Sequence, residues 1–180
     1  MEQTEIQTAT LAGGCFWCLE AVYEQVPGVE RIIPGYTGGT MVNPGYEAVC
    51  SGRTGHAEVV RITFDAQRVS FVRLLEIFFS IHDPTTLNRQ GNDVGTQYRS
   101  AIFYHSGEQQ AEAANMIAEL NERHLWPSTI VTELQPATTF YEAEDYHHHY
   151  YARHPEQGYC QFVIAPKLEK FREAFAGRTE

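Results

Sequence analysis

Residues 13–18 read Gly-Gly-Cys-Phe-Trp-Cys, which places two cysteines beside two large aromatic side chains. The glycines after a short apolar run predict a tight turn that leaves Cys15 unshielded at the start of a helix. Unpaired N–H groups and the helix dipole favour a thiolate there, so we expect a lowered pKa for Cys15. Because the thiolate is the nucleophilic form, Cys15 is a candidate nucleophile, and a buried structural cysteine is the alternative.

The same segment carries two further signals. Phe16 and Trp17 could wall a small apolar pocket that suits a methyl or thioether group, or they could be ordinary core aromatics. Cys15 and Cys18 also have the C-x-x-C spacing of thioredoxin-like dithiols, which is a weak signal on its own. A dithiol oxidoreductase that exchanges disulfides is therefore an alternative function.

Glu58 is the most informative residue outside the cysteines. Residues 57–65 alternate as a strand, and Glu58 has the same parity as Val60, Ile62 and Phe64. It is therefore expected to point to the same apolar face. Desolvation there would raise the pKa of Glu58, so that it could stay protonated near neutrality and act as a general acid. The alternative is a Glu at a strand end that reaches solvent.

Two turn-rich loops are candidates for binding a substrate. Residues 34–55 are rich in glycine and carry Tyr36 and Tyr46, which predicts an ordered functional loop rather than a linker. A second loop covers residues 83–98, and its polar end leads into a strand. Such loops often supply oriented hydrogen-bonding groups to a site, and Asp93 and Tyr98 are the candidates here.

Three adjacent histidines occupy positions 147–149. Neighbouring residues on a helix point in different directions and cannot all ligate one metal ion, whereas zinc uses spaced ligands. We therefore predict a solvated face and no metal at these positions. A metal-binding module built from the cysteines and His147, His148 and His149 is the non-enzymatic alternative.

The elements that must position these residues mix strands and helices without strict alternation. This pattern predicts an α+β fold with a mixed sheet, as a single domain over residues 1–180. The predicted strands are residues 8–11, 29–33, 57–65, 100–105 and 129–134. The predicted helices run from about Cys15 to Pro27, from Ser70 through Phe78, from Ser106 through about Arg123, and over 167–175.

Composition narrows the class of protein. The chain has 180 residues, of which 43% are hydrophobic and 20% charged, and this balance is typical of a globular protein. The net charge of -10 argues against nucleic acid as a partner. The first ten residues do not resemble a secretory signal and no apolar run could span a membrane, so we expect a cytoplasmic protein. Four cysteines are too few for a disulfide scaffold, which favours redox, nucleophilic or metal chemistry.

Several segments, taken in order along most of the chain, resemble the A-type methionine sulfoxide reductases. Their combination is far more specific than any one of them. The matching segments are Gly-Cys-Phe-Trp at 14–17, Gly-Tyr-Thr-Gly-Gly at 35–39, Asn-Pro at 43–44 with Tyr46, Val-Cys-Ser-Gly at 49–52, Thr-Gly-His-Ala-Glu at 54–58, His-Asp-Pro at 82–84, residues 91–100, Ala-Glu-Asp-Tyr-His at 143–147 and Gly-Tyr-Cys at 158–160.

The resemblance implies a role for each matching position. It implies that Cys15 is the nucleophile and Glu58 the acid, within a two-layer α+β sandwich that has a mixed sheet. The remaining implied roles are a pocket for the substrate methyl group at Phe16 and Trp17, binding of the sulfoxide oxygen or a site water at Tyr46, Asp93 and Tyr98, and a resolving thiol at Cys160. The chain departs from the commonest pattern at Cys18, where many relatives have Gly, and at His148 and His149.

The resemblance also implies a reaction. The enzyme would reduce the S epimer of methionine sulfoxide, free and in proteins, since each epimer needs its own enzyme. Cys15 would become a sulfenic acid, a second thiol would form an intramolecular disulfide with it, and thioredoxin would reduce that disulfide. The implied partners are thus oxidised proteins, free methionine sulfoxide and thioredoxin, with no metal or organic cofactor.

Two cysteines compete to be the first resolving thiol. If Cys15 and Cys18 share one helical turn, their side chains should diverge, and a disulfide has narrow geometry. Cys160 follows Gly158 in a segment near the C-terminus that we expect to be flexible, so its thiol could move to meet Cys15. We therefore favour Cys160 first, with Cys18 taking over the bond by exchange, and we regard Cys50 as a bystander.

Overall fold

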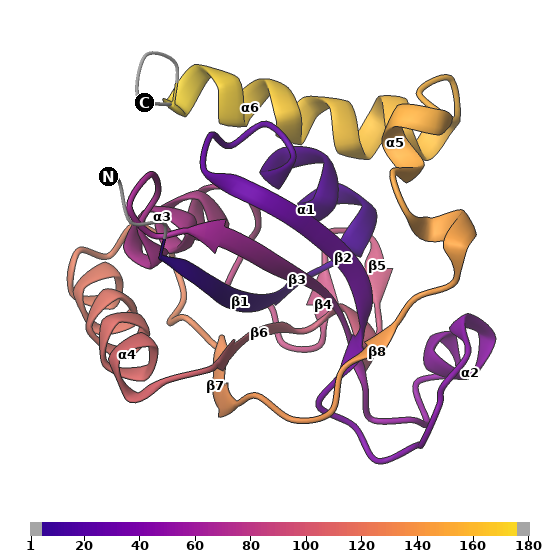
Figure 1. Ribbon diagram of the computed structural model, residues 1–180, viewed down its shortest axis with the longest axis horizontal. Helices are drawn as coiled ribbons and strands as arrows, with labels where there is room; N and C mark the ends of the chain where they lie inside the picture. The colour runs from indigo at the N-terminus through magenta and orange to yellow at the C-terminus, as the bar shows by residue number, and fades with distance from the viewer. Residues whose placement is uncertain (1–4, 176–180) are drawn as a thin grey trace.

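A six-stranded mixed sheet forms the centre of the computed structural model, which describes residues 5–175 (Figure 1). The strand order is β7-β6-β1-β3-β2-β8. All neighbours are antiparallel except β6 and β7, which are parallel. The strands are β1 (Ile6–Gly13), β2 (Val29–Thr37), β3 (Ala57–Asp65), β6 (Ser100–Tyr104), β7 (Glu133–Pro136) and β8 (Tyr141–Glu142), and a separate ribbon pairs β4 (Arg89–Gln90) with β5 (Asp93–Val94).

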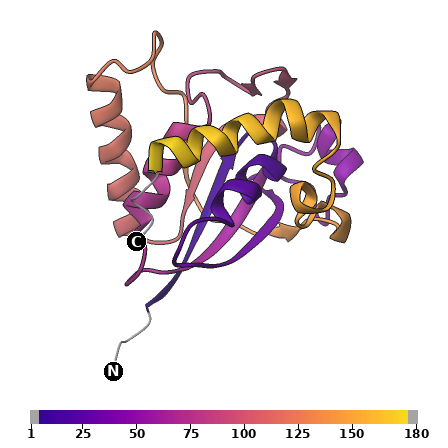
Figure 2. The same ribbon diagram turned by 90° about the horizontal axis from the view of Figure 1, so that it is seen from above.

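The longer helices cover one face of this sheet. Helix α1 packs on β2 and β3, and α6 crosses over α1, as the view from above shows (Figure 2). The helices are α1 (Phe16–Tyr23), α2 (Tyr46–Cys50), α3 (Phe71–Ile81), α4 (Gly107–Glu122), α5 (Tyr150–Arg153) and α6 (Ala165–Phe175). Short 3-10 turns η1 (Thr96–Tyr98) and η2 (Asp145–His147) and a π-helical turn η3 (Cys160–Ile164) complete the described elements.

Strand β3 shows how sequence alternation builds the two sides of the sheet. Val60 and Ile62 join the large core beneath the helices, whereas Val59 belongs to a smaller apolar cluster on the opposite face. Phe140, in the segment between β7 and β8, packs against that smaller cluster. Because successive side chains of a strand point to opposite faces, Glu58 shares the helix-covered face with Val60, as predicted.

Side-chain caps explain where two of the helices begin. The Ser70 hydroxyl accepts a hydrogen bond from the Arg73 N–H (3.0 Å) and starts α3. The Ser106 hydroxyl accepts from the Gln109 N–H (3.2 Å) and starts α4. The Gln109 side chain returns to the His105 N–H (2.9 Å), one residue earlier than an ideal capping box. Both predicted helix starts are therefore confirmed.

The α+β fold with a mixed sheet is confirmed, but several predicted boundaries are wrong. Helix α1 ends at Tyr23 rather than at Pro27, and β2 continues to Thr37 because Thr37 still pairs with Ala57 of β3. The strand predicted over 129–134 forms only as β7, which starts at Glu133. The final helix begins at Ala165 after a π-helical turn. The domain bounds of 1–180 extend beyond the described residues and stay a prediction.

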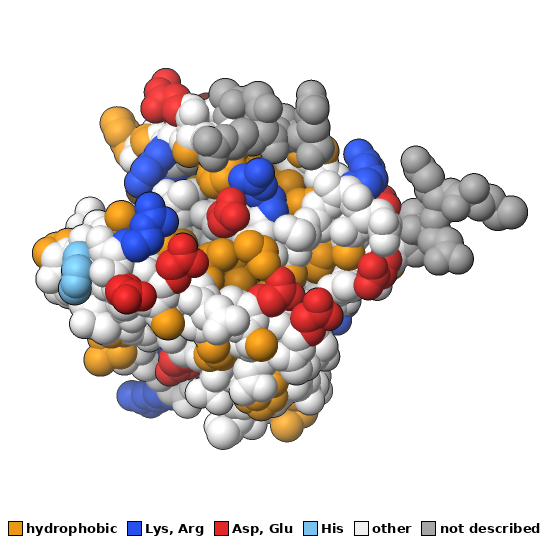
Figure 3. All heavy atoms as spheres, turned by 90° about the vertical axis from the view of Figure 1, so that its left-hand side faces the viewer, with side chains coloured by type: hydrophobic (Ala, Val, Ile, Leu, Met, Phe, Trp, Pro, Cys, Tyr) orange, Lys and Arg blue, Asp and Glu red, His pale blue; other side chains and the backbone are white. Residues whose placement is uncertain are grey.

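The surface fits the acidic composition. On the face drawn in Figure 3, Asp and Glu side chains lie among Lys and Arg side chains, and the described residues drawn there form no continuous basic surface. Within residues 5–175, no helix is both long and apolar enough to cross a membrane.

Core packing on α3 can be tested with one pair of substitutions. Leu74 is fully buried in the main core, whereas Leu87 is 71% exposed. We expect Leu74→Ala to lower the free energy of unfolding by about 2–5 kcal/mol, because it removes buried methyl groups and leaves a cavity. Leu87→Ala should change it by less than about 0.5 kcal/mol. Denaturant unfolding checks both, and equal effects of the two variants would contradict the assigned core.

Candidate active site

The turn between β1 and α1 brings Cys15 to the end of a central strand. Gly14 has a φ of +95°, and a Cβ atom there would lie 2.7 Å from the Gln90 side chain, so only glycine fits. Cys15 is the N-cap residue of α1, with extended backbone angles, and is only 7% exposed. The predicted tight turn is thus present, but it leaves the thiol nearly buried.

Glu58 lies against the first turn of the same helix. One carboxyl oxygen, Oε1, accepts a hydrogen bond from the Phe16 N–H (3.2 Å), and the side chain is 1% exposed. The other oxygen, Oε2, has no hydrogen-bond partner among the described residues. Burial raises the pKa of Glu58 to about 8, despite the opposing Phe16 N–H. The predicted raised pKa is confirmed, and the group can donate a proton near neutrality.

The lowered pKa that we predicted for Cys15 is wrong for this resting structure. Burial raises the pKa of the Cys15 thiol well above its ordinary value, and the neighbouring Cys18 thiol and Glu58 carboxyl raise it further. The Trp17 N–H at the start of the helix opposes this shift but is a weaker influence. Cys15 and Glu58 therefore both hold their protons at neutral pH, before a substrate arrives.

Cys18 is a direct neighbour of Cys15. The Cys18 thiol is 2% exposed and is a hydrogen-bond partner of the Cys15 thiol. The expected divergence of the two side chains is therefore wrong. The reason is local, because Cys15 is an N-cap with extended backbone and not a residue within the helical turn. The Cys18 sulfur also lies 3.9 Å from the Tyr159 hydroxyl.

Tyr159 connects the sulfur atoms to Asp93. Its hydroxyl donates a hydrogen bond to Asp93 Oδ2 (2.8 Å), which projects from β5. Burial and the charges of Cys15 and Cys18 raise the pKa of Tyr159, so the phenol stays neutral. Sequence reasoning missed Tyr159 as a site residue, although it lies beside Cys160 in the Gly-Tyr-Cys segment.

Trp17 is held in place by two other aromatic residues. Its indole Nε1 donates a hydrogen bond to His147 Nδ1 (3.0 Å), and its ring stacks on Tyr150 with centroids 3.7 Å apart. Trp17 is only partly buried, so it can present a face to a substrate. Phe16 is fully buried, and its ring centroid lies 5.0 Å from that of His147, so it packs behind these aromatic residues within the core.

The three histidines do not form the predicted solvated face. His147 is fully buried, and burial lowers its pKa to about 4, so it is a neutral acceptor for Trp17. Sequence periodicity did not reveal this burial, because the segment is a short 3-10 turn. His148 Nε2 lies 3.2 Å from the Ala143 carbonyl, and His149 Nδ1 contacts Glu24. The three rings thus face different partners, as expected from their adjacency.

Tyr46 and Tyr98 approach the site from two separate turns. Tyr46 begins α2, its N–H donates to Glu144 Oε2 (3.0 Å), and its ring lies 4.5 Å from that of His147. Burial raises the pKa of Tyr46 and of Tyr98, and the Glu58 charge raises both further. Both phenols therefore lie near the carboxyl and remain donors. The Tyr46 hydroxyl also has the exposed Cys50 thiol as a hydrogen-bond neighbour.

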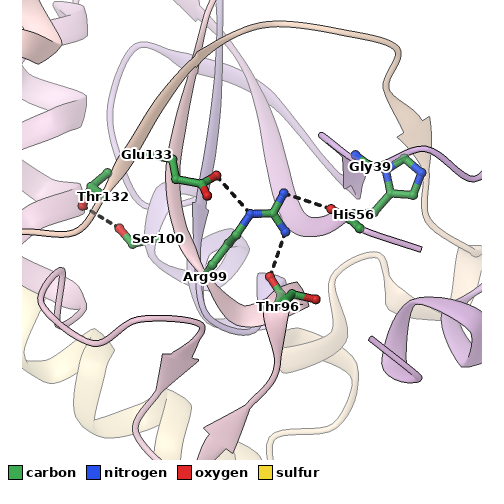
Figure 4. Close-up of polar contacts among 8 residues, drawn as sticks. Gly39, His56, Thr96, Arg99, Ser100, Thr132 and Glu133 are labelled. Carbon is green, nitrogen blue, oxygen red and sulfur yellow. Dashed lines mark hydrogen bonds and ion pairs between the residues drawn. The ribbon is translucent and has the colours of Figure 1, made fainter. Parts of the chain in front are cut away.

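Arg99 anchors the turn that carries Tyr98. Its guanidinium donates to the Thr96 carbonyl (2.9 Å) and the Gly55 carbonyl (3.0 Å), and it pairs with Glu133 (3.1 Å). Figure 4 shows Arg99 between Thr96 of this turn and Glu133 of β7. Because Arg99 immediately follows Tyr98, these contacts fix the chain at the end of η1, where Tyr98 lies.

The site now combines a buried thiol, a protonated carboxyl and an aromatic wall. Residues 7–179 match the family model described as peptide methionine sulfoxide reductase. The chain belongs to this family. The reductase is 57% identical to the peptide methionine sulfoxide reductase MsrA of Polynucleobacter asymbioticus over 170 residues, which cover 94% of this chain and 90% of the relative.

Solved structures agree with this membership. The reductase resembles reduced Mxr1 from Saccharomyces cerevisiae with a TM-score of 0.81 and 35% identity, over 87% of this chain and 90% of that one. It also resembles Mxr1 in a complex with Trx2, with a TM-score of 0.58 and 26% identity, over 83% and 90% of the two chains. The enzyme is therefore an oxidoreductase that acts on methionine sulfoxide, and its fold is that of the family.

Cys160 of the reductase, which we expected in a flexible segment, lies in a helical turn that packs against the core. It begins the π-helical turn η3 and is fully buried. Leu168, Phe171 and Phe175 of the following α6 pack into the main core and hold this segment in helical form. Burial, with the charge of Cys18 next, raises the pKa of Cys160. Cys160 is therefore a protonated thiol at neutral pH.

The electrostatic link between Glu58 and Cys15 generates a testable prediction. We expect the rate at which iodoacetamide alkylates Cys15 to rise with pH. The midpoint of this rise should lie above the ordinary thiol pKa of about 8.5. Glu58→Gln should lower that midpoint, because the ionised carboxylate that opposes the thiolate is gone. Alkylation at each pH is located by tandem mass spectrometry.

The exposed Glu47, in the first turn of the neighbouring helix α2, supplies the control. Glu47→Gln should leave the midpoint unchanged. A midpoint below the ordinary thiol value in the unsubstituted enzyme would contradict the buried, protonated resting thiol.

Proposed function

We propose that this reductase converts the S epimer of methionine sulfoxide, free and in proteins, to methionine, with Cys15 as nucleophile and Glu58 as acid. The observation that carries the proposal is the buried Glu58 carboxyl, hydrogen-bonded to the residue next to Cys15. A sulfoxide oxygen leaves only after protonation, and the raised pKa of about 8 keeps that proton available. Epimer choice follows from the family, since each epimer needs its own enzyme.

The first step forms a bond between the Cys15 sulfur and the sulfoxide sulfur. Glu58 protonates the sulfoxide oxygen, and Tyr46 and Tyr98 donate hydrogen bonds to it as negative charge develops. The oxygen then transfers to the Cys15 sulfur, and the bond between this oxygen and the substrate sulfur breaks. The sulfur–sulfur bond breaks as methionine departs, Cys15 becomes a sulfenic acid, and the proton released by the thiol restores Glu58. The thiolate supplies the electron pair, so the step needs no metal or organic cofactor.

The pocket for the S-methyl group lies against Trp17. Its hydrogen bond to His147 and its stack on Tyr150 support a fixed wall, and Phe16 fills the space behind it. A rigid apolar wall favours a methyl group over a charged one. Asp93, held by the Tyr159 hydroxyl, is suited to orient a water molecule beside the reacting oxygen.

The contact between the Cys15 and Cys18 thiols supports Cys18 as the first resolving residue, in place of the order favoured by the sequence. The Cys18 thiol condenses with the sulfenic acid, which releases water and forms the Cys15–Cys18 disulfide. The Cys160 thiolate then attacks Cys18, which frees Cys15 and leaves a Cys18–Cys160 disulfide. This transfer moves the oxidised bond away from the substrate pocket.

Thioredoxin is the proposed reductant of the final disulfide. The complex of the similar Mxr1 with Trx2, a thioredoxin, supports this partner. Exposed Phe162 lies two residues beyond Cys160 and offers an apolar contact next to the bond to be reduced. A cytoplasmic location fits this cycle, because thioredoxin keeps thiols reduced there.

The acid role of Glu58 predicts both a rate loss and a changed pH profile. Glu58→Gln should slow the sulfoxide step by about 10²–10⁴-fold, the usual contribution of general acid catalysis. The reactive form pairs a Cys15 thiolate with a protonated Glu58, so the pair holds one proton. That form becomes populated as the pH rises past about 8, where the pair loses its first proton. It stays populated until the pair loses its second proton at higher pH.

Single-turnover rates of S-sulfoxide reduction therefore should rise to about pH 8 and then level off in the unsubstituted enzyme. In Glu58→Gln the inflection near that pH should disappear, because only Cys15 still titrates. Cys15→Ser should abolish the reaction even with excess dithiothreitol, and Cys50→Ser should react normally. Retention of the full rate by Glu58→Gln would assign the acid role to another group.

The order of the thiols is tested with Cys160→Ser. We expect this variant to complete one rapid turnover, to accumulate a Cys15–Cys18 disulfide, and to lose most of its cycling with thioredoxin. Peptide mass mapping after one equivalent of substrate identifies the bond. Cys18→Ser should instead slow formation of the first disulfide. A Cys15–Cys160 bond that forms at full speed in Cys18→Ser would restore the order that the sequence favoured.

A further inference from the structure

Three potential metal ligands meet at the C-terminal end of α1, away from the catalytic thiols at its start. Glu20 and Glu24 are four residues apart, so they share one side of the helix end. His149 approaches them from the segment before α5. One ligand atom of each residue lies within 4.8 Å of those of the other two. The reaction proposed above uses none of these three side chains.

Glu20 is the residue that most directly indicates a bound ligand. It is only 2% exposed, and its Oε2 atom has no hydrogen-bond partner among the described residues. The backbone N–H groups of His149 and Tyr150 point to the same carboxyl group. A buried carboxyl oxygen without a partner is costly, and a bound cation removes that cost.

His149 is presented to this carboxyl pair by an unusual backbone conformation. Its φ is +55°, in the left-handed region that residues other than glycine seldom adopt. The Nδ1 atom faces Glu24 Oε1, and the side chain remains 60% exposed. A neighbouring cavity of about 380 Å³, lined also by His148, Glu30 and Arg31, leaves room for coordinating water.

We propose that Glu20, Glu24 and His149 bind a divalent transition metal of the zinc class. Two carboxylates and one imidazole supply oxygen and nitrogen donors that zinc accepts, and water would take the fourth position. The imidazole disfavours calcium and magnesium, which take oxygen ligands. The two acidic groups also compensate the charge of the dication.

The bound ion acts as a structural clip, not as a participant in the reaction. It joins the end of α1 to His149, and the next residue, Tyr150, stacks on Trp17. Metal binding therefore holds the substrate wall against the helix that carries the nucleophile. Because the ion binds the folded state, it should raise the unfolding temperature.

Calorimetric titration of the full chain with Zn²⁺ tests the site. We expect one equivalent to bind to Glu20, Glu24 and His149, and His149→Gln and Glu24→Gln to weaken that binding by at least about tenfold. These two residues are exposed enough to be replaced without loss of the fold, whereas Glu20 is buried. His148→Gln is the matched control, because His148 lines the same cavity but contacts the Ala143 carbonyl. The control should bind Zn²⁺ as the unsubstituted chain does.

Because cysteine thiolates also bind zinc, Co²⁺ bound to the same proteins identifies the ligand type. The proposed site gives visible bands without intense sulfur-to-metal charge transfer, and it persists in the Cys15→Ser/Cys18→Ser variant. In thermal unfolding, the metal should raise the midpoint of the unsubstituted chain but not that of His149→Gln. The proposal is overturned if Zn²⁺ binds equally well to His149→Gln and Glu24→Gln. It is also overturned if Co²⁺ gives a charge-transfer band that is lost when the cysteines are replaced.

Discussion

The hydrogen bond from the Phe16 N–H to the Glu58 carboxyl is the contact on which the site depends. It ties the first turn of α1 to the central strand β3, and so sets the position of Cys15 relative to Glu58, the proposed acid. The contact forms only because Gly14 adopts a positive φ and lets the chain turn sharply after β1. The helical layer then covers the carboxyl, and this burial keeps its proton on at neutral pH.

The same burial suppresses the reactivity of Cys15, the proposed nucleophile, in the resting enzyme. Cys15 is almost inaccessible and its pKa is raised, so little thiolate is present before substrate binds. Oxidants attack thiolates far more readily than thiols. An enzyme that repairs oxidised methionine is thereby protected from losing its own cysteine to the oxidant. In the proposed mechanism, the substrate therefore helps to generate the thiolate, through the proton transfer to the sulfoxide oxygen.

Strand alternation was sufficient to predict the buried face of Glu58, because period-two patterning is local and strong in β3. The pKa of Cys15 could not be predicted in this way, since it depends on residues far away in the sequence that cover it. The Cys18 thiol lies beside Cys15 because Cys15 is an N-cap residue with extended backbone. The C-x-x-C spacing does not specify this conformation. Burial of His147 and Cys160 likewise comes from tertiary packing of short, irregular turns, where periodicity carries no signal.

Because Trp17 stacks on Tyr150, its fluorescence should report on the proposed substrate pocket. Indole emission responds to the polarity around the ring and to nearby quenching groups, and Trp17 has a phenol parallel to it and an imidazole on its N–H. The chain has one other tryptophan, Trp126, which lies beyond α4 and lines a separate hollow with His124 and Pro127. Intrinsic fluorescence of the unlabelled enzyme therefore contains a signal from the substrate wall, and replacing Trp126 with Phe would isolate it.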